Sequence, residues 1–454
     1  MTPTPRKVHF VSLGCPKNLV DGEVMQGMLV REGHELVLDP AQADVLVVNT
    51  CSFIDEAKEE SIDTILELAR YKEEGRASRL IVTGCLAERY GTVLRQSMPE
   101  VDVFVGTGNF LELPKLLVAD APKPTYVGAQ HVLHEADAPR IQATPFYTSF
   151  LKIAEGCNRT CSFCIIPKIR GRQESRSIAS LVEEARRLAD AGVRELSLIA
   201  QDLTSYGTDR DDGANLTRLL EALLEVDGID WFRLLYMYPQ HVTDELLRLV
   251  AREERICSYL DMPLQHGSDR ILRAMRRGTA GTSRRLRELV ARIRDRVPGV
   301  VLRSSFIVGF PGETEDDFAE LLAFIEECRF ERVGVFRYSH EEGTAAYELG
   351  DQISERVKET RRRRAMRLAA RIARETNASL VGTTLPVLVC GQLDNGRWFG
   401  RTQTQAADID GVVLLRGQAL EAGTIVPVQI TRASTYDLEG AVCERPAESA
   451  ASVA

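Results

Sequence analysis

Three cysteines lie close together near the middle of the chain, in the segment Cys157-Asn-Arg-Thr-Cys161-Ser-Phe-Cys164. One short loop therefore supplies three thiolates, which are soft ligands that select zinc or iron–sulfur clusters. A structural zinc site normally has four protein ligands, and the sequence offers no obvious fourth ligand nearby. Three thiolates instead fit a cubane [4Fe–4S] cluster that has one iron without a protein ligand. We favour this interpretation over zinc.

A second set of cysteines is spread over the first part of the chain. Cys15, Cys51 and Cys85 each follow an apolar run typical of a buried strand, namely VHFVSLG, VLVVNT and LIVTG. Ligands of open parallel sheets gather beyond the carboxyl ends of the strands, so these thiols should meet at one edge. We expect a second three-thiolate cluster there, with an open iron able to hold an exogenous sulfur species. The alternative is three ordinary core cysteines. We expect the remaining four, Cys257, Cys328, Cys390 and Cys443, to be packed or partly exposed thiols without a catalytic role.

Strands and helices alternate along residues 1–120, which predicts a doubly wound α/β domain that positions Cys15, Cys51 and Cys85. Its expected strands are Val8–Leu13, Val45–Val48, Leu80–Val82 and Val101–Val105, and its expected helices are Asn18–Arg31, Ile54–Tyr71 and Ala87–Gln96. Residues 121–148 contain several Pro and Ala residues and are predicted to be a linker.

Residues 149–350 repeat the strand–helix pattern six times, which predicts a partial (β/α)6 barrel with functional groups at its C-terminal rim. The expected strands are Phe150–Ile153, Glu195–Ala200, Trp231–Tyr236, Tyr259–Pro263, Val300–Val308 and Val333–Tyr338. A basic helix should connect over residues 351–380, with its run Arg361–Arg364 on a solvated face. Residues 381–444 predict a small antiparallel β barrel, followed by a frayed tail at 445–454.

The central cysteine motif resembles the signature CxxxCxΦC of the radical S-adenosylmethionine superfamily, with Phe163 at the aromatic position. The resemblance implies that the amino and carboxylate groups of S-adenosylmethionine chelate the open iron. An electron from the reduced cluster would then cleave the sulfonium and release methionine and a 5′-deoxyadenosyl radical. Such chemistry belongs to the cofactors, while the protein positions them.

Polar residues at the ends of the barrel strands are candidates to contact this cofactor. Beside Phe163 we single out Gln201 at the second strand, Gln265 at the fourth and Ser304 in the fifth. Packing or turn formation is the alternative role for each. The segment Ser305–Glu313 resembles the superfamily's adenine-contacting GxIxGxxE stretch, but it has Ser305 for the first glycine and its glutamate one place late.

Two cysteine trios followed by a small β barrel resemble the methylthiotransferases, in which a C-terminal TRAM domain follows the radical domain. The resemblance covers about 440 residues. It implies insertion of sulfur into an unactivated C–H bond and methylation, with two S-adenosylmethionine molecules consumed. We expect no catalytic acid or base, because hydrogen-atom abstraction by a nucleoside radical does not require one.

The opening VSLGCPKNLVDGE resembles the branch of that family that modifies ribosomal protein S12, at the β-carbon of an aspartate. The stretches Cys51–Ser61 and Tyr338–Thr344 resemble the same branch. A tRNA-modifying branch, acting on a modified adenosine, more often opens with a Tyr-Gly-Cys-Gln-Met-Asn-like sequence. A third hypothesis, of another class, is a non-enzymatic iron–sulfur electron carrier.

Charge and composition bear on the partners. The chain of 454 residues has a formal net charge of −9, which does not favour general adhesion to nucleic-acid phosphates. Between Leu385 and Cys443 there are four arginines, no lysine and six acidic residues, a balance that argues for a basic protein substrate and against tRNA. We find no apolar run that could span a membrane and no signal core, so we expect a cytoplasmic enzyme. It would need an electron donor such as flavodoxin or ferredoxin.

Overall fold

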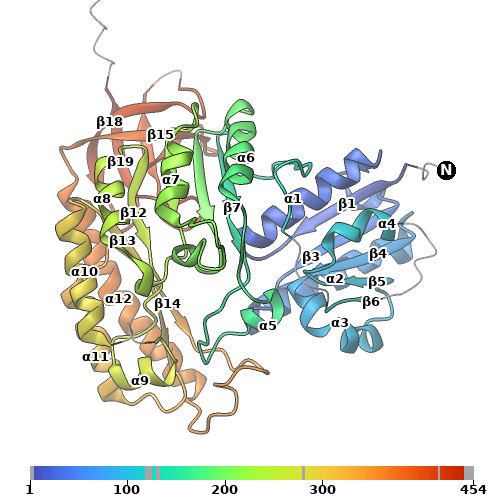
Figure 1. Cartoon of the computed structure of the whole chain (residues 1–454), viewed down its shortest axis with the longest axis horizontal. Helices are drawn as coiled ribbons and strands as arrows, with labels where there is room; N and C mark the ends of the chain where they lie inside the picture. Colours follow the sequence, from blue (N-terminus) through green and yellow to red (C-terminus); the bar gives the residue numbers. More distant parts are fainter. Residues whose placement is uncertain (1–4, 118–124, 129–132, 279–281, 418–419, 444–454) are drawn as a thin grey trace, which may run out of the picture.

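The computed structural model describes residues 5–117, 125–128, 133–278, 282–417 and 420–443. Three large β structures follow one another along the described chain (Figure 1): a six-stranded sheet, a second six-stranded sheet and a closed five-stranded barrel; a short two-stranded sheet accompanies the second. The predicted fold class, two α/β parts and a small β barrel, is confirmed.

The first sheet is entirely parallel, with the strand order β2-β1-β3-β4-β5-β6. The winding reverses between β1 and β3, which makes their carboxyl ends the switch point where ligands of such sheets bind. The strands are β1 Lys7–Ser12, β2 Glu35–Leu36, β3 Val45–Thr50, β4 Arg79–Gly84, β5 Val103–Val105 and β6 Thr125–Tyr126.

Helices cover both faces of this sheet, because successive side chains of a strand point to opposite sides. Val45 and Val47 of β3 pack in the same core cluster as residues of α1 (Pro16–Arg31) and α4 (Leu113–Leu116). Leu46 and Val48 pack in a second cluster with α2 (Asp55–Glu74) and α3 (Cys85–Ser97). All six residues of β3 are therefore buried, as expected for a strand with both faces covered.

Part of the predicted linker, residues 121–148, is built into the fold. Thr125–Tyr126 form β6 on the first sheet. Arg140 forms ion pairs with Glu23 of α1 at 2.5 Å and with Glu184 of α6 (Ile178–Asp190) at 2.8 Å. The stretch therefore fastens the first sheet to the second unit. Residues 121–124 and 129–132 of that linker, and the predicted tail 445–454, lie outside the described residues.

The second sheet is also parallel, with the order β14-β13-β12-β11-β10-β7. β7 and β14 form its two edges, so the sheet is an open, partial barrel, with helices along its outer side (Figure 1). Its strands are β7 Thr148–Lys152, β10 Glu195–Ile199, β11 Trp231–Leu234, β12 Ile256–Asp261, β13 Val301–Val308 and β14 Arg332–Arg337. The other elements of this part of the chain are β8 Ala154–Glu155, β9 Glu174–Ser175, α5 Ile166–Arg170, α7 Leu216–Leu224, α8 Asp244–Arg252, α9 Asp269–Ala274, α10 Ser283–Arg296, α11 Glu315–Cys328 and α12 Glu355–Ser379.

Short 3-10 helices occur in both parts of the chain. η1 Pro40–Gln42 and η2 Phe110–Glu112 accompany the first sheet, and η3 Leu203–Ser205 and η4 Pro239–His241 accompany the second.

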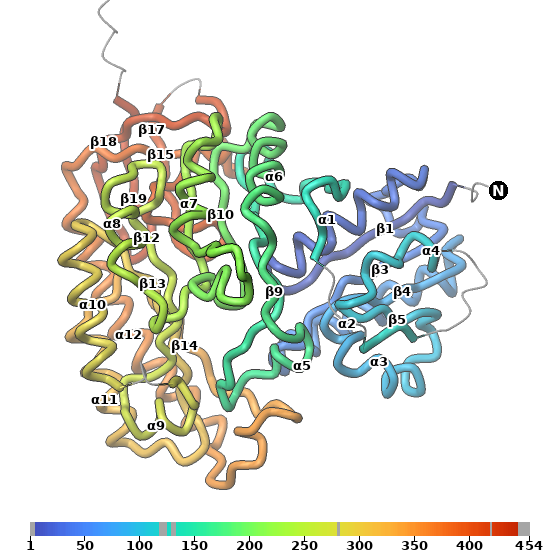
Figure 2. Tube along the Cα trace, in the orientation of Figure 1, coloured from blue at the N-terminus to red at the C-terminus, as the bar shows by residue number. Residues whose placement is uncertain are grey.

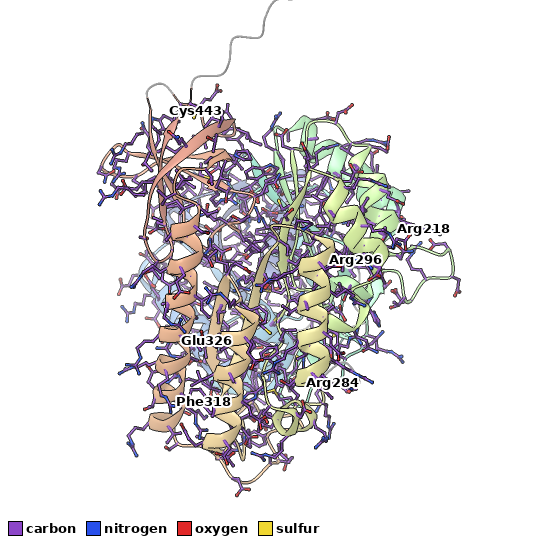
Figure 3. All side chains as sticks on the ribbon, turned by 90° about the vertical axis from the view of Figure 1, so that its left-hand side faces the viewer. Arg218, Arg284, Arg296, Phe318, Glu326 and Cys443 are labelled. Carbon is purple, nitrogen blue, oxygen red and sulfur yellow. The ribbon has the colours of Figure 1, made fainter. Side chains whose placement is uncertain are left out.

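The outermost layer consists of α10, α11 and α12, which run side by side; Figure 3 labels Arg284 and Arg296 on α10 and Phe318 and Glu326 on α11. Three of the four arginines of the basic run of α12 lie on the surface as predicted, and Arg361 is the exception. Arg361 is buried and donates to Glu313 at 3.0 Å, because that carboxylate lies under the helix. The other three arginines pair with glutamates on the surface.

The C-terminal barrel has the order β15-β16-β17-β19-β18 and a small apolar core of its own. Its strands are β15 Thr384–Gln392, β16 Trp398–Thr402, β17 Val413–Arg416, β18 Ile425–Ala433 and β19 Leu438–Val442. The prediction of an antiparallel barrel is wrong for one pair, since β17 and β19 are parallel where the barrel closes. Of the helices in the described ranges, none is both long enough and apolar enough to cross a membrane.

Candidate functional site

The first three cysteines come from three adjacent strands of the first sheet. Cys15 caps the N-terminus of α1 after β1, Cys51 follows β3, and Cys85 begins α3 after β4. Because β1, β3 and β4 are neighbours, the three thiols share one edge of the sheet, at the switch point. Burial, together with the charges of Cys51 and Cys15, raises the pKa of Cys85 to about 12. The trio is therefore close enough to interact electrostatically, and without metal the buried Cys85 is a neutral thiol.

Two glycines allow the backbone to approach these cysteines. Gly14 has φ +91°, and a Cβ there would lie 2.8 Å from the Cβ of Cys51. Gly84 has φ +94°, and its Cβ would lie 2.6 Å from the carbonyl oxygen of Thr50. Real Cβ contacts are not this short, so only glycine fits at either strand end. Gly14 and Gly84 therefore allow the strand ends that carry Cys15 and Cys85 to lie close to Cys51.

The central cysteines lie on the loop between β8 and α5. The backbone N–H of Arg159 donates to Cys157 Sγ at 3.4 Å, and Arg277 Nη1 donates to Cys161 Sγ at 3.3 Å. Burial raises the pKa of Cys164 to about 12 and also raises that of Cys157. Metal ligation would deprotonate such thiols, so loading these sites releases protons.

α5 lies between the second sheet and the first (Figures 1 and 2), and it begins two residues after Cys164. Cys85 packs in one apolar cluster with Ile165 and Ile169, and Ile165 directly follows Cys164. Arg170, at the end of α5, donates to Cys85 Sγ at 3.4 Å. The rim of the second sheet is therefore the surface that the first trio faces.

The donor set of each trio fits an iron–sulfur cluster, since three thiols from one edge or one loop are soft ligands. Within residues 5–117, 125–128, 133–278, 282–417 and 420–443, no three His, Cys, Asp or Glu side chains are grouped tightly enough to hold a single metal ion. The assignment of Cys15, Cys51, Cys85, Cys157, Cys161 and Cys164 as ligands stays a prediction.

The residues predicted to contact S-adenosylmethionine gather at the same rim. Gln201 donates to Glu155, while its Oε1 is buried and without a hydrogen-bond partner among the described residues, so it fits a donor from a bound molecule. Gln265 has φ +74°, and its backbone extends the pairing toward β13. Ser304 is buried, and its hydroxyl accepts from Leu264 N–H at 3.2 Å. Phe163 packs against a small apolar cluster. Their contacts with a cofactor stay predictions.

Glu313 stabilises the segment Ser305–Glu313, which resembles the adenine-contacting stretch, by hydrogen bonds to the backbone of that segment. Glu313 accepts from the backbone N–H groups of Gly309 and Phe310 and from Arg361. Burial raises the pKa of Glu313 to about 7 in spite of these donors. The carboxylate therefore holds the turn after β13.

Sequence reasoning missed the cations that surround the thiols. Lys17 lies 3.3 Å from the centroid of the Tyr236 ring, which joins α1 to the end of β11. Arg159 pairs with Asp202 at 2.7 Å. Arg170 and Arg277 are far in sequence from the sulfurs that they contact. Arg159, inside the central cysteine motif, and Lys17, two residues after Cys15, had a signal in the sequence that could have revealed them.

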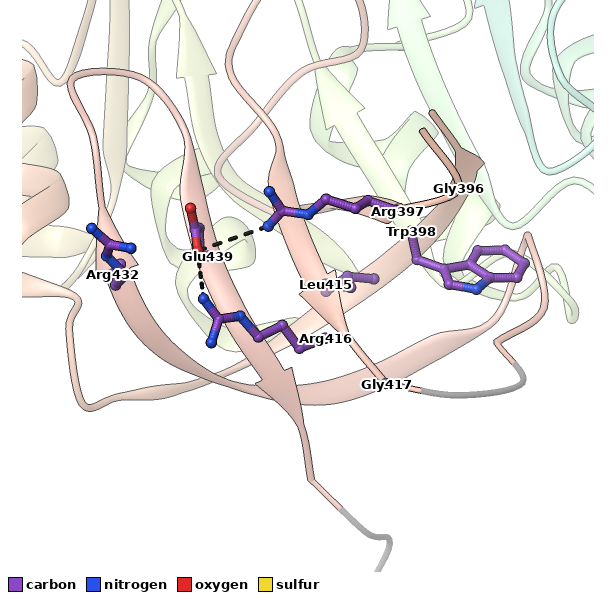
Figure 4. A pocket seen from close by; sticks show the side chains of 8 residues that line it. All are labelled: Gly396, Arg397, Trp398, Leu415, Arg416, Gly417, Arg432 and Glu439. Carbon is purple, nitrogen blue, oxygen red and sulfur yellow. Dashed lines mark hydrogen bonds and ion pairs between the residues drawn. The ribbon is translucent and has the colours of Figure 1, made fainter. Parts of the chain in front are cut away.

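A hollow of about 460 Å³ lies on the C-terminal barrel, away from both trios (Figure 4). It is lined by Gly396, Arg397, Trp398, Leu415, Arg416, Gly417, Arg432 and Glu439. Three of the barrel's four arginines thus surround one glutamate, while the fourth, Arg401, is buried against Glu195. The net acidic balance of the barrel is therefore not spread evenly over its surface.

Comparison with family models divides the chain in the same way. Residues 7–106 match "Uncharacterized protein family UPF0004", residues 151–325 match the radical SAM superfamily and residues 381–443 match the TRAM domain. With the parallel sheet and the cysteine loop, these matches define a radical SAM protein. Its core also resembles the solved radical S-adenosylmethionine methyltransferase TsrM from Kitasatospora setae, with a TM-score of 0.54 at 16% identity over 74% of this chain and 72% of that one. That likeness concerns the fold alone.

Relatives along the whole length identify the family. "Ribosomal protein uS12 methylthiotransferase RimO" from Pelobacter propionicus is 48% identical, covering 97% of this chain and 98% of its own. The proteins of the same name from Geotalea uraniireducens and Myxococcus xanthus are 48% and 49% identical, covering 97% and 98% of this chain and 99% and 93% of their own. The chain belongs to the RimO methylthiotransferase family.

Proposed function

We propose that this protein is a radical S-adenosylmethionine methylthiotransferase that attaches a methylthio group to the β-carbon of an aspartate of ribosomal protein S12. The observation that carries the proposal is the contact of Cys85 with Ile165, Ile169 and Arg170, which directly follow the central cysteines, in a chain whose full-length relatives are named uS12 methylthiotransferases. When bound, two [4Fe–4S] clusters supply the electron that cleaves S-adenosylmethionine and an open iron that holds the sulfur to be transferred.

The residues of the chain would bind and orient these groups. Cys157, Cys161 and Cys164 would hold the cluster at the rim, and Cys15, Cys51 and Cys85 the other. The free Oε1 of Gln201 supports a role in accepting a hydrogen bond from S-adenosylmethionine. Phe163, Gln265 and Ser304 would contact S-adenosylmethionine at the same rim. The packing of Ile165 and Ile169 on Cys85 supports exclusion of water between the trios.

Each part of the chain would have its own role in this reaction. We assign residues 1–120 and 149–350 to the two cluster-binding domains, with 121–148 as the segment that joins them. Residues 351–380 would connect to a barrel of residues 381–444. The names of the relatives support S12 as the protein substrate, and hence a cytoplasmic site of action. A one-electron donor such as flavodoxin or ferredoxin would reduce the clusters.

Iron counting and product analysis test the proposal together. The anaerobically purified protein should hold about eight irons per chain, and replacement of either trio by alanine should remove about half. The reduced protein should convert S-adenosylmethionine to 5′-deoxyadenosine, and a loaded protein that yields none would indicate the electron carrier. Mass spectrometry of S12 and of tRNA nucleosides from a deletion strain should show loss of the methylthio group from S12. Loss from tRNA alone would reject S12 as the substrate and favour the tRNA enzyme.

A further inference from the structure

Each cysteine trio has an arginine that donates a hydrogen bond to one of its sulfurs. Arg170 Nη2 lies 3.4 Å from Cys85 Sγ, and Arg277 Nη1 lies 3.3 Å from Cys161 Sγ. Neither arginine is close in sequence to its sulfur, since the pairs are separated by 85 and 116 positions. The tertiary fold alone brings each guanidinium to its thiol.

Arg170 is held by a buried network that fixes its direction. Its Nη1 donates to Asp21 at 2.6 Å and to Glu155 at 3.0 Å, while its Nη2 also donates to Asn18 at 3.0 Å. Lys152 contacts the same two carboxylates. Two cations thus face two anions, and a buried charge is tolerated when it is paired and hydrogen-bonded in this way. The second N–H of its Nη2 points at Cys85.

Arg277 reaches its sulfur in a different environment. It is 6% exposed, and its Nη2 donates to the carbonyl oxygen of Pro263 at 2.7 Å. Its guanidinium lies 4.3 Å from the centroid of the Tyr238 ring, and that of Arg159 lies 4.1 Å from it. Among the described residues no carboxylate pairs with Arg277. Its positive charge therefore acts on Cys161 with less compensation than that of Arg170 on Cys85.

We propose that Arg170 and Arg277 are positioning residues, each donating a hydrogen bond to one cluster-ligating sulfur and setting the reduction potential of that cluster separately from the other. The proposal rests on the proposed function, because it requires both clusters. Reduction adds one electron to a cluster, and hydrogen bonds to its sulfurs and nearby positive charge favour the reduced state. Loss of either arginine should thus make the potential of its own cluster more negative.

The experiment uses full-length protein that carries one cluster at a time. Cys157→Ala/Cys161→Ala/Cys164→Ala keeps the first trio, and Cys15→Ala/Cys51→Ala/Cys85→Ala keeps the central trio. Arg170→Gln, Arg170→Lys and Arg277→Gln are added to each background. Every protein is reconstituted, its iron is counted, and its midpoint potential is measured by a redox titration followed by electron paramagnetic resonance.

We expect Arg170→Gln to shift the reduction equilibrium of the first cluster at least tenfold toward the oxidised state, about 59 mV for one electron, and to leave the central cluster unchanged. Arg277→Gln should do the reverse. Arg170→Lys keeps the charge beside Asp21 and Glu155, so it protects the fold and should give a smaller shift of the same sign. A shift below threefold in proteins with about four irons per chain, or equal shifts of both clusters, would overturn the inference. Failure of both backgrounds to bind iron would instead overturn the proposed function.

Discussion

Arg170 and Cys85 are in direct contact, guanidinium to sulfur at 3.4 Å, although one lies on the helix after the central cysteines and the other at an end of the first sheet. The contact joins the first sheet to the helix that follows the central cysteines. Arg170 also binds Glu155, two residues before Cys157. One side chain therefore links both cysteine sets, and the separation between them is set by buried contacts.

Replacement of Gly14 by alanine should abolish iron binding by the first trio. A Cβ at this position would lie 2.8 Å from the Cβ of Cys51, so the strand end must move and the thiols separate. We expect iron to fall from about eight to about four per chain, as two cubanes become one. Iron analysis together with the spectrum of the remaining cluster measures this loss.

Gly33→Ala is the matched control. Gly33 has φ +90°, so alanine bears the same backbone strain of about 1–2 kcal/mol, but no atom lies within 4 Å of its Cβ. This variant should keep about eight irons. Equal iron loss in the two variants would mean that backbone strain, and not the contact with Cys51, is responsible.

The sequence predicts the strands and their order, because these follow from local hydrophobic patterns. It does not predict contacts between side chains that are far apart in the sequence. Each predicted strand of the two sheets overlaps an observed one, although only Val103–Val105 of the predicted Val101–Val105 is extended. The convergence of Cys15, Cys51 and Cys85 follows from strand order alone. Arg170 and Arg277 could not be found, because nothing near them in sequence indicates which sulfur they contact. Arg361 was misjudged, because nothing near it in the sequence indicates that it packs against the buried carboxylate of Glu313.

Replacement of Glu195 by glutamine should loosen the C-terminal barrel from the second sheet. Glu195 of β10 pairs with Arg401 of the barrel and with Arg233 at 2.8 Å, and both arginines are buried. Removing one partner of a buried pair leaves an uncompensated charge, which costs about 3–5 kcal/mol. Urea unfolding at pH 7, followed by tryptophan fluorescence, should show this loss of unfolding free energy.

The same carboxylate gives a pH dependence of known sign. Burial alone would raise the pKa of Glu195, but Arg401 and Arg233 outweigh it and lower the pKa to about 2 from an ordinary 4.5. Its stabilisation is therefore complete above pH 4.5 and is lost as the pH falls toward 2, by about 3 kcal/mol. The difference in stability between wild type and Glu195→Gln should shrink over this range. Glu253→Gln, which removes an exposed pair with Arg252, is the control and should cost about 0–1 kcal/mol at any of these pH values.

Replacement of Glu341 by glutamine should open the contact between the first sheet's helices and the loop after β14. The Glu341 carboxylate is buried and accepts from Lys58 of α2 at 2.9 Å and from Arg89 of α3 at 2.7 Å. A neutral amide leaves these two cations without their shared anion, although Lys58 still has Asp55 at 2.6 Å. We expect hydrogen exchange of the backbone amides at the N-terminal ends of α2 and α3 to become about tenfold faster, as local opening becomes easier by about 1.4 kcal/mol.

Glu342→Gln tests whether the effect comes from the buried anion or from the loop itself. Glu342 is exposed, and its contact with Arg89 is made by its backbone carbonyl, at 2.7 Å, which the substitution keeps. Exchange in α2 and α3 should then match the wild type. Faster exchange in both variants would show that any change in the loop loosens the contact. Unchanged exchange in Glu341→Gln would show that apolar packing around α5, and not this ion pair, holds the two cysteine trios together.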